Sequence, residues 1–250
     1  MNGADTFLVD GQRLTADQCR ELFCNHNLTD RQIKVADRIE GDTVLDIGCY
    51  AGVFVEEVIR RFPEKKISGV DYFEDNVRLS RLLHPGHADR FSQMSAYDLQ
   101  FPESHFDCVT LQEVLEHLEG AAQSIKEMNR VLKVGGVLIV SVPNPFFIRD
   151  MLAFFRFELR NAWWRFRGKR TRLGTEVYFD EVEWNRHIFS WTPQTLLTLF
   201  HVNGFEYVEH CYENGRPNPV ARLFLKLFPF FGPTQILKVR KVAPAPAKLV

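Results

Sequence analysis

The chain has 250 residues, of which 45% are hydrophobic and 25% charged, and this composition excludes a disordered or collagen-like protein. The formal net charge is −1, so the chain as a whole carries no field that would attract nucleic acid. The five cysteines form no CxxC pair, which argues against a disulfide framework or a cysteine zinc site. No uninterrupted run of eighteen apolar residues occurs, and we therefore expect a cytoplasmic protein.

Two short helices are predicted first, and apolar runs then alternate with segments of helical periodicity. The second helix is expected to start at Thr29, because Thr29 and Gln32 have the spacing of a capping box. The predicted strands cover residues 43–47, 67–71, 91–94, 106–111, 137–142, 205–211 and 235–240. The predicted helices cover residues 15–23, 29–39, 53–62, 74–83, 114–118, 121–132 and 193–201. This alternation indicates βαβ crossovers and predicts an α/β fold with a doubly wound sheet.

The most informative segment is 44–52, VLDIGCYAG, in which a strand ends and a glycine turn leads into a helix. In a doubly wound sheet the ligand lies at the carboxyl ends of the strands, and the loop after the first strand lies there. Glycine at this point lets the backbone approach a ligand closely. The dinucleotide pattern GxGxxG fails, because Tyr50 and Val53 occupy the positions of its second and third glycines.

This segment resembles the first motif of class I S-adenosylmethionine-dependent methyltransferases, in which an acidic residue precedes GxGxG. Tyr50 replaces the middle glycine, and its side chain should cover or reshape the methionine end of the pocket. Further motifs follow in family order: Asp71 at the end of the second strand, SAYDLQFP at 95–102, and the fourth- and fifth-strand segments within 106–144. In that order Ser95 replaces the aspartate that commonly meets the adenine amino group.

The resemblance implies a Rossmann-like, seven-stranded mixed sheet in a single domain over residues 1–250, with a cofactor-binding half at 29–145. It implies S-adenosyl-L-methionine as the cofactor, with Asp71 at the ribose hydroxyls, Tyr72 against adenine and the Ala96 amide beside it. The expected cofactor contacts are Arg31, Asp46, Gly48, Cys49, Gly52, Asp71, Tyr72, Ala96 and Gln112.

The segment Glu113-x-x-Glu116-His117 follows the fourth strand, and in much of the superfamily such a segment is structural. It also resembles the ExxEH of small-RNA 3′-terminal 2′-O-methyltransferases and of ubiquinone-pathway O-methyltransferases. That resemblance implies a divalent cation such as Mg held by candidates Glu113, Glu116, His117 and His187, which suits carboxylate and imidazole ligands. Glu113, His117 and His187 are the candidate catalytic residues, and His187 could act as a base unaided.

Residues 146–186 interrupt the alternation and are predicted to form a helical substrate lid inserted after the fifth strand. Arginines and aromatic side chains are interleaved between 154 and 172, and residues 220–233 are rich in leucine and phenylalanine. Such segments suit single-stranded RNA, an anionic membrane surface or amphiphilic substrate, or a lid whose aromatics pack on the core.

We expect O-methylation of a small, amphiphilic or glycan-linked metabolite, with peripheral contact at the inner membrane surface through 154–172 and 220–233. An RNA 2′-O-methyltransferase with a metal site is the second hypothesis, and it is less favoured because the whole chain is not basic. A non-catalytic methyltransferase-like binding protein is the third, because Tyr50 and Ser95 depart from the family pattern.

Overall fold

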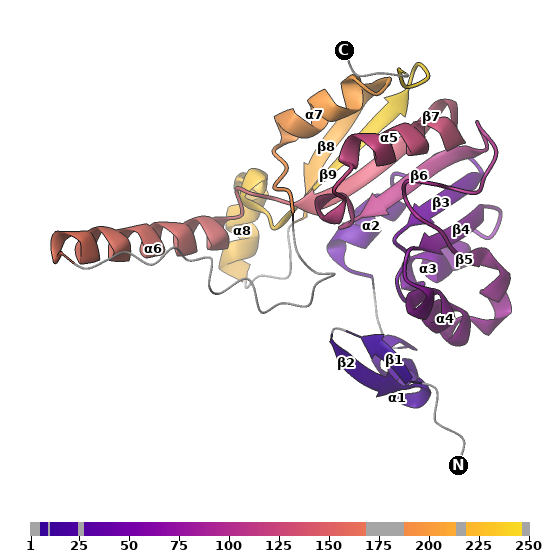
Figure 1. Cartoon of the computed structure of the whole chain (residues 1–250), viewed down its shortest axis with the longest axis horizontal. Helices are drawn as coiled ribbons and strands as arrows, with labels where there is room; N and C mark the ends of the chain where they lie inside the picture. The colour runs from indigo at the N-terminus through magenta and orange to yellow at the C-terminus, as the bar shows by residue number, and fades with distance from the viewer. Residues whose placement is uncertain (1–5, 10, 25–27, 169–187, 214–218, 247–250) are drawn as a thin grey trace.

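The computed structural model describes residues 6–9, 11–24, 28–168, 188–213 and 219–246 (Figure 1). Its main sheet has seven strands in the order β5-β4-β3-β6-β7-β9-β8, with β9 antiparallel to both of its neighbours and the other strands parallel. The strands are β3 (Thr43–Ile47), β4 (Lys66–Asp71), β5 (Phe91–Gln93), β6 (Phe106–Gln112), β7 (Leu132–Pro143), β8 (Phe205–Tyr212) and β9 (Thr234–Lys241). The predicted seven-stranded, doubly wound α/β fold is confirmed.

Helices cover both faces of this sheet. They are α2 (Asp30–Ala36), α3 (Val53–Arg61), α4 (Glu74–Leu83), α5 (Ala121–Val131) and α7 (Pro193–His201), with 3-10 turns η1 (Pro85–Arg90) and η2 (Leu115–His117). Neighbouring strand residues point to opposite faces, so Val44 packs with α2, α3 and α4 while Leu45 packs with α5 and α7. Both faces are therefore apolar, which is why the strands read as continuous hydrophobic runs.

The predicted start of α2 is confirmed in atomic detail. The backbone N–H of Gln32 donates to Thr29 Oγ1 at 3.2 Å, and the backbone N–H of Thr29 donates to Gln32 Oε1 at 2.9 Å. These two bonds satisfy N–H groups that have no partner within the helix, and they fix where the chain turns toward β3.

The start of β7 differs from the prediction, which began this strand at residue 137. The strand already begins at Leu132 and runs through both glycines. A Cβ on Gly136 would lie 2.9 Å from the carbonyl oxygen of Asp107, so glycine permits a close approach of β7 to β6 where the register between them shifts.

A small N-terminal unit was predicted only as a helix. It consists of a hairpin of β1 (Thr6–Val9) and β2 (Gln12–Thr15) followed by α1 (Ala16–Cys24). Phe7, Val9 and Cys19 bury their side chains with Leu79 of α4, which attaches this unit beside the main sheet (Figure 1). Two four-residue strands carry too little alternation to be recognised from the sequence.

The inserted segment after β7 begins with the long helix α6 (Ile148–Phe166), which extends away from the sheet (Figure 1). Before β9 the chain forms α8 (Pro219–Leu227) and the turn η5 (Pro229–Phe231), which cover most of the leucine- and phenylalanine-rich residues 220–233. Residues 169–187 of the predicted lid lie outside the described residues. Among the helices that the structure describes, none is long and apolar enough to cross a membrane.

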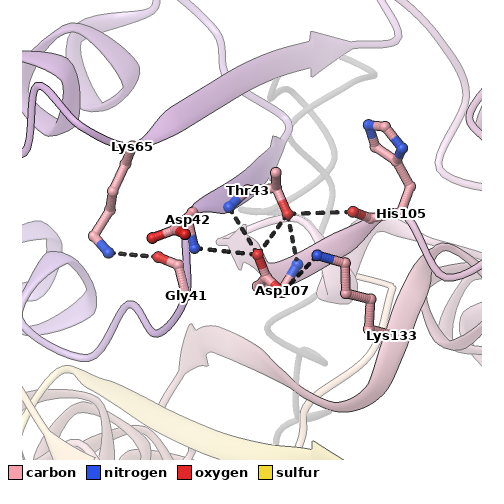
Figure 2. A network of polar contacts seen from close by, with 7 residues as sticks. All are labelled: Gly41, Asp42, Thr43, Lys65, His105, Asp107 and Lys133. Atoms are coloured by element: carbon pink, nitrogen blue, oxygen red, sulfur yellow. Dashed lines mark hydrogen bonds and ion pairs between the residues drawn. The ribbon is translucent and has the colours of Figure 1, made fainter.

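A partly exposed polar network holds β3 and β6 together at the edge of the sheet where these strands begin (Figure 2). The carboxylate of Asp107 accepts hydrogen bonds from the backbone N–H groups of Asp42 and Thr43, from Thr43 Oγ1 at 2.7 Å and from Lys133 Nζ at 2.7 Å. Burial opposes ionisation of Asp107, but the bonds from Lys133 and Thr43 outweigh it and hold the pKa of Asp107 below its usual range.

Asp107→Ala should lower the free energy of unfolding by about 2–3 kcal/mol, because it removes a carboxylate that satisfies several donors at once. Its depressed pKa means that this stabilisation is present above the ordinary pKa of 3.8 and is lost as the pH falls below it. Urea unfolding at pH 7 and pH 3 measures both effects, with the exposed neighbour Asp42→Ala as the control. An equal loss in the control would contradict the assignment.

Candidate active site

Two adjoining cavities lie where β3, β4 and β6 end. The smaller, of about 320 Å³, is lined by residues of α2, of the loop after β3 and of α1. The larger, of about 1010 Å³, extends from that loop past the ends of β4 and β6. Gly48, Tyr50 and Gln112 line both cavities. The two cavities therefore meet at the loop after β3 and the end of β6.

The smaller cavity contains polar atoms that the described protein residues leave without hydrogen bonds. Arg31 Nε and Gln112 Oε1 are buried and have no hydrogen-bond partner there, although Arg31 Nη1 lies 3.6 Å from a carboxylate oxygen of Glu113. Unpartnered buried polar atoms are costly, and their presence in a cavity indicates a polar ligand. A carboxylate beside Arg31 and an ammonium beside Gln112 would satisfy both, which fits the amino-acid end of S-adenosylmethionine.

Asp46 forms the floor of this cavity and is buried. Thr110 Oγ1 donates to its carboxylate at 2.6 Å, and Gln112 Nε2 lies at 3.4 Å. Burial raises the pKa of Asp46 to about 7, although the bond from Thr110 opposes the rise. A cationic ligand in the cavity would favour the ionised form, so Asp46 supplies negative charge where an ammonium would lie.

The loop after β3 reaches over the end of β4. The backbone N–H groups of Gly48 and Cys49 both donate to the carbonyl of Val70. Tyr50 has a φ of 48°, in the left-handed region that favours glycine, and its ring lies edge-on to Phe23 of α1 at 5.8 Å between centroids. Tyr50 lines both cavities, and its effect on the methionine end of the pocket stays a prediction.

Asp71 lies at the end of β4, is buried and lines the larger cavity. One carboxylate oxygen accepts the backbone N–H of Tyr50 at 2.9 Å, and the other accepts the Phe73 N–H and Asn76 Nδ2, each at 3.0 Å. The carboxylate is thereby fixed in position and keeps acceptor capacity for a further donor, as contact with a ribose hydroxyl requires. Tyr72, with 66% of its side chain exposed, and buried Ala96 line the same cavity.

The segment after β6 adds acidic groups and an imidazole to the site. Glu113 and His117 line the larger cavity, whereas Glu116 is fully buried and does not line it. Burial raises the pKa of Glu116 to about 8, the charge of Glu113 adds to the rise, and neither carboxylate oxygen of Glu116 has a hydrogen-bond partner among the described residues. His117 Nε2 lies 3.9 Å from Glu116 Oε1. Glu113 has a φ of 55°, a strained conformation of the kind that collects at functional sites.

The predicted metal ligands do not converge in the part of the chain that the structure describes. No group of three His, Cys, Asp or Glu side chains there is arranged to hold an ion, and Glu116 does not line the cavity that Glu113 and His117 share. The fourth candidate, His187, lies outside the described residues. Glu113, Glu116 and His117 by themselves therefore do not fit a divalent cation.

Most predicted cofactor residues line one or both cavities. Gly52 lines neither: it precedes α3 with a φ of 75°, and a Cβ there would lie 2.8 Å from the ring of Phe91. Several lining residues were not predicted from the sequence, namely Phe23, Thr29, Asn76, Met94, Tyr97 and Ile188. Asn76 could have been predicted, because it follows Asp71 by five residues and its side-chain amide can donate to that carboxylate. Phe23 could not, because it reaches the site only where the N-terminal unit packs against the main domain.

Comparison with known proteins is consistent with this geometry. A family model described as a methyltransferase domain matches residues 20–210. A probable S-adenosylmethionine-dependent methyltransferase of Mycolicibacterium smegmatis is 35% identical over 114 residues, covering 44% of this chain and 42% of that protein. The ubiquinone biosynthesis O-methyltransferase of Hydrogenovibrio crunogenus is 32% identical over 129 residues, covering 50% and 53%. The chain thus spans about half the length of the curated relatives it matches.

A solved S-adenosylmethionine-dependent methyltransferase from Archaeoglobus fulgidus superposes with a TM-score of 0.55 at 19% sequence identity. The superposition covers 89% of this chain and 94% of that one. At this identity the likeness supports the fold, and it covers a larger share of the chain than the matches to the curated relatives do.

Proposed function

The chain belongs to the class I S-adenosylmethionine-dependent methyltransferase family, and on this premise we propose that it methylates a hydroxyl group of a small, amphiphilic acceptor. The observation that carries the proposal is the pair of joined cavities, one with unpartnered polar atoms at Arg31 and Gln112 and one bordered by Asp71. The name of the Hydrogenovibrio relative supports oxygen as the methylated atom.

The larger cavity has room for the acceptor beside the cofactor. Met94, Val114, Leu118 and Ile188 give it apolar walls, while Glu113 and His117 supply polar groups. Small-molecule sites commonly combine an apolar lining with a few placed polar side chains. An apolar acceptor that carries a hydroxyl group therefore suits this cavity better than a fully polar one.

When bound, S-adenosylmethionine supplies a methyl group that its sulfonium already activates. Arg31, Gln112 and Asp71 would hold and orient the two ends of the cofactor, and the walls of the larger cavity would keep water from the reacting atoms. His117 would accept the proton of the acceptor hydroxyl at an imidazole nitrogen as the new carbon–oxygen bond forms and the carbon–sulfur bond breaks. His117 would then release this proton to water once the methylated acceptor has left the cavity.

The proposal is tested first by calorimetry with S-adenosylmethionine, and an absence of binding at millimolar cofactor would reject it. Asp71→Ala should weaken that binding about thirtyfold, because a fixed, charged acceptor contributes roughly 2 kcal/mol. Asp75→Ala on the exposed surface of α4 is the matched control. Phenols and catechols with apolar chains form the acceptor panel, with release of S-adenosylhomocysteine as the readout.

Arg31→Met should lower the affinity for S-adenosylmethionine about tenfold while leaving 5′-methylthioadenosine binding unchanged. The second ligand lacks the amino-acid end that Arg31 is proposed to meet, so it serves as an internal control. Calorimetry with both ligands measures the difference. An equal loss for both would show that Arg31 acts on the site only through its ion pair with Glu113.

Metal-dependent methylation of RNA has less support from the described residues. The carboxylates and imidazole of the segment after β6 do not form a cluster of ligands there. Activity that falls on treatment with a chelator and returns with Mg²⁺ would reopen that alternative.

A further inference from the structure

Helix α6 exposes large apolar side chains that no element of the described chain covers. It has 19 residues, and Asn161 is its one buried residue. Leu152, Phe155, Leu159, Trp163 and Phe166 have between 50% and 90% of their surface exposed. A lid whose aromatic residues pack on the core, which was one interpretation of the sequence, does not describe these side chains.

These five residues form one stripe. They follow one another at intervals of three or four residues, which places them within about 80° of the helix circumference at roughly 100° per residue. The stripe runs along most of the helix, and the helix itself extends away from the body of the protein (Figure 1). An apolar stripe of this kind normally faces a protein core, and here it faces outward.

Arginines border the stripe along one side. Arg149, Arg156, Arg160 and Arg167 are exposed and lie about 40–80° from Leu152 around the helix. Arg167 lies over the ring of Trp163 at 4.2 Å, so cation and aromatic are in contact. The two acidic residues of α6 are both paired, Asp150 with Arg149 at 3.3 Å and Glu158 with Arg165 at 3.5 Å, and α6 has no further acidic residue to neutralise Arg156, Arg160 and Arg167. The bordered face is therefore positively charged although the chain as a whole has a net charge of −1.

A second apolar segment is attached at the start of α6. Leu223, Leu227 and Phe228, at the exposed face and end of α8, have between 45% and 67% of their surface exposed. The buried amide of Asn144, just before α6, donates to the carbonyl groups of Phe230 and Gly232, each at 2.7 Å. These bonds fix the turn after α8 beside the first residues of α6, so the two segments are held at one end of the molecule.

We propose that α6, together with α8, binds the surface of an anionic lipid bilayer. Leucine and phenylalanine enter the boundary between headgroups and acyl chains, and the bordering arginines meet lipid phosphates. Single-stranded RNA would also attract the arginines, but bases stack on aromatic rings, and exposed leucines at 152, 159, 223 and 227 offer them no such surface. Binding through this surface does not depend on the proposed methyl transfer.

The test measures partitioning of the full chain onto vesicles of phosphatidylcholine with and without phosphatidylglycerol. Phe155 and Phe154 form a matched pair, because they are adjacent and similarly exposed, at 55% and 60%, but only Phe155 lies in the stripe. Phe155→Glu should weaken binding to the anionic vesicles about tenfold, whereas Phe154→Glu should change it less than about twofold. Phe155→Leu should retain binding, which separates loss of the apolar contact from damage to the helix.

The charge of the surface is tested in the same assay. Arg156→Glu with Arg160→Glu should weaken binding to anionic vesicles and leave weak binding to neutral vesicles unchanged, while Lys66→Glu, exposed at the start of β4, serves as the control. Equal losses for Phe154→Glu and Phe155→Glu would overturn the proposal. It would also be overturned if wild-type protein ignored both vesicle types, or if Phe155→Glu abolished retention of single-stranded RNA and left vesicle binding intact.

Discussion

His117→Ala is expected to lower kcat about a hundredfold or more while leaving the Kd for S-adenosylmethionine unchanged, because general-base assistance typically contributes 10²–10⁴. His117 lines the larger cavity, where an acceptor hydroxyl would lie, and it lines no part of the smaller cavity proposed for the amino-acid end. Single-turnover measurements at saturating cofactor separate the chemical step from binding.

The matched control for His117 is His201→Ala, which removes an exposed imidazole at the end of α7. It should leave both kcat and the cofactor Kd unchanged. A structural role for His117, as the similar segment has in much of the superfamily, predicts a different pattern: lower thermal stability and weaker cofactor binding with little change in kcat. That pattern would remove His117 from the proposed mechanism.

Glu116→Gln should make the protein more stable at alkaline pH. The carboxyl group ionises near its ordinary pKa of 4.5 in the unfolded chain, but burial and the charge of Glu113 raise its pKa to about 8 in the folded protein. Between these values the unfolded state releases a proton that the folded state keeps, so stability is full below pH 4.5 and falls as the pH rises toward 8. The loss amounts to on the order of 4 kcal/mol above pH 8.

Urea unfolding of the native protein and Glu116→Gln at pH 5 and pH 9 measures this contribution. The variant should gain about 4 kcal/mol relative to the native protein between the two pH values, because glutamine does not ionise. Exposed Glu64→Gln provides the control and should show no such gain. A difference between native and variant that does not change with pH would contradict the burial-raised pKa.

Asp46 acts in the same direction, since burial raises its pKa from 3.8 to about 7. The site thus contains two buried carboxyl groups, Asp46 and Glu116, whose ionisation destabilises the folded protein. Buried carboxyl groups of this kind are retained where ligand binding or chemistry needs a charge. Stabilising interactions in other parts of the protein compensate for the folding free energy that they cost. The network around Asp107, at the opposite edge of the sheet, is one source of that stability.

The sequence by itself determined the order and type of the elements of the main sheet, because burial on both faces leaves each strand as a short apolar run between helical segments. It also placed Asp46, Gly48, Asp71 and Gln112 at strand ends, and the carboxyl ends of parallel strands necessarily meet at one edge. Most of the proposed cofactor residues could be predicted for this reason, because they belong to the strands or closely follow them; Arg31, on α2, is the exception.

Only the tertiary structure decided which side chains share a cavity and which are covered. It showed that Glu116 is buried outside the lining of the cavity while His117 lines it, that Phe23 reaches Tyr50 from the N-terminal unit, and that the apolar side chains of α6 are exposed. In each case the same local sequence pattern is compatible with a covered side chain and with one that faces a cavity or solvent. An amphipathic helix or a Glu-His pair fixes which side chains share a face, but the packing of segments distant in sequence decides what that face meets.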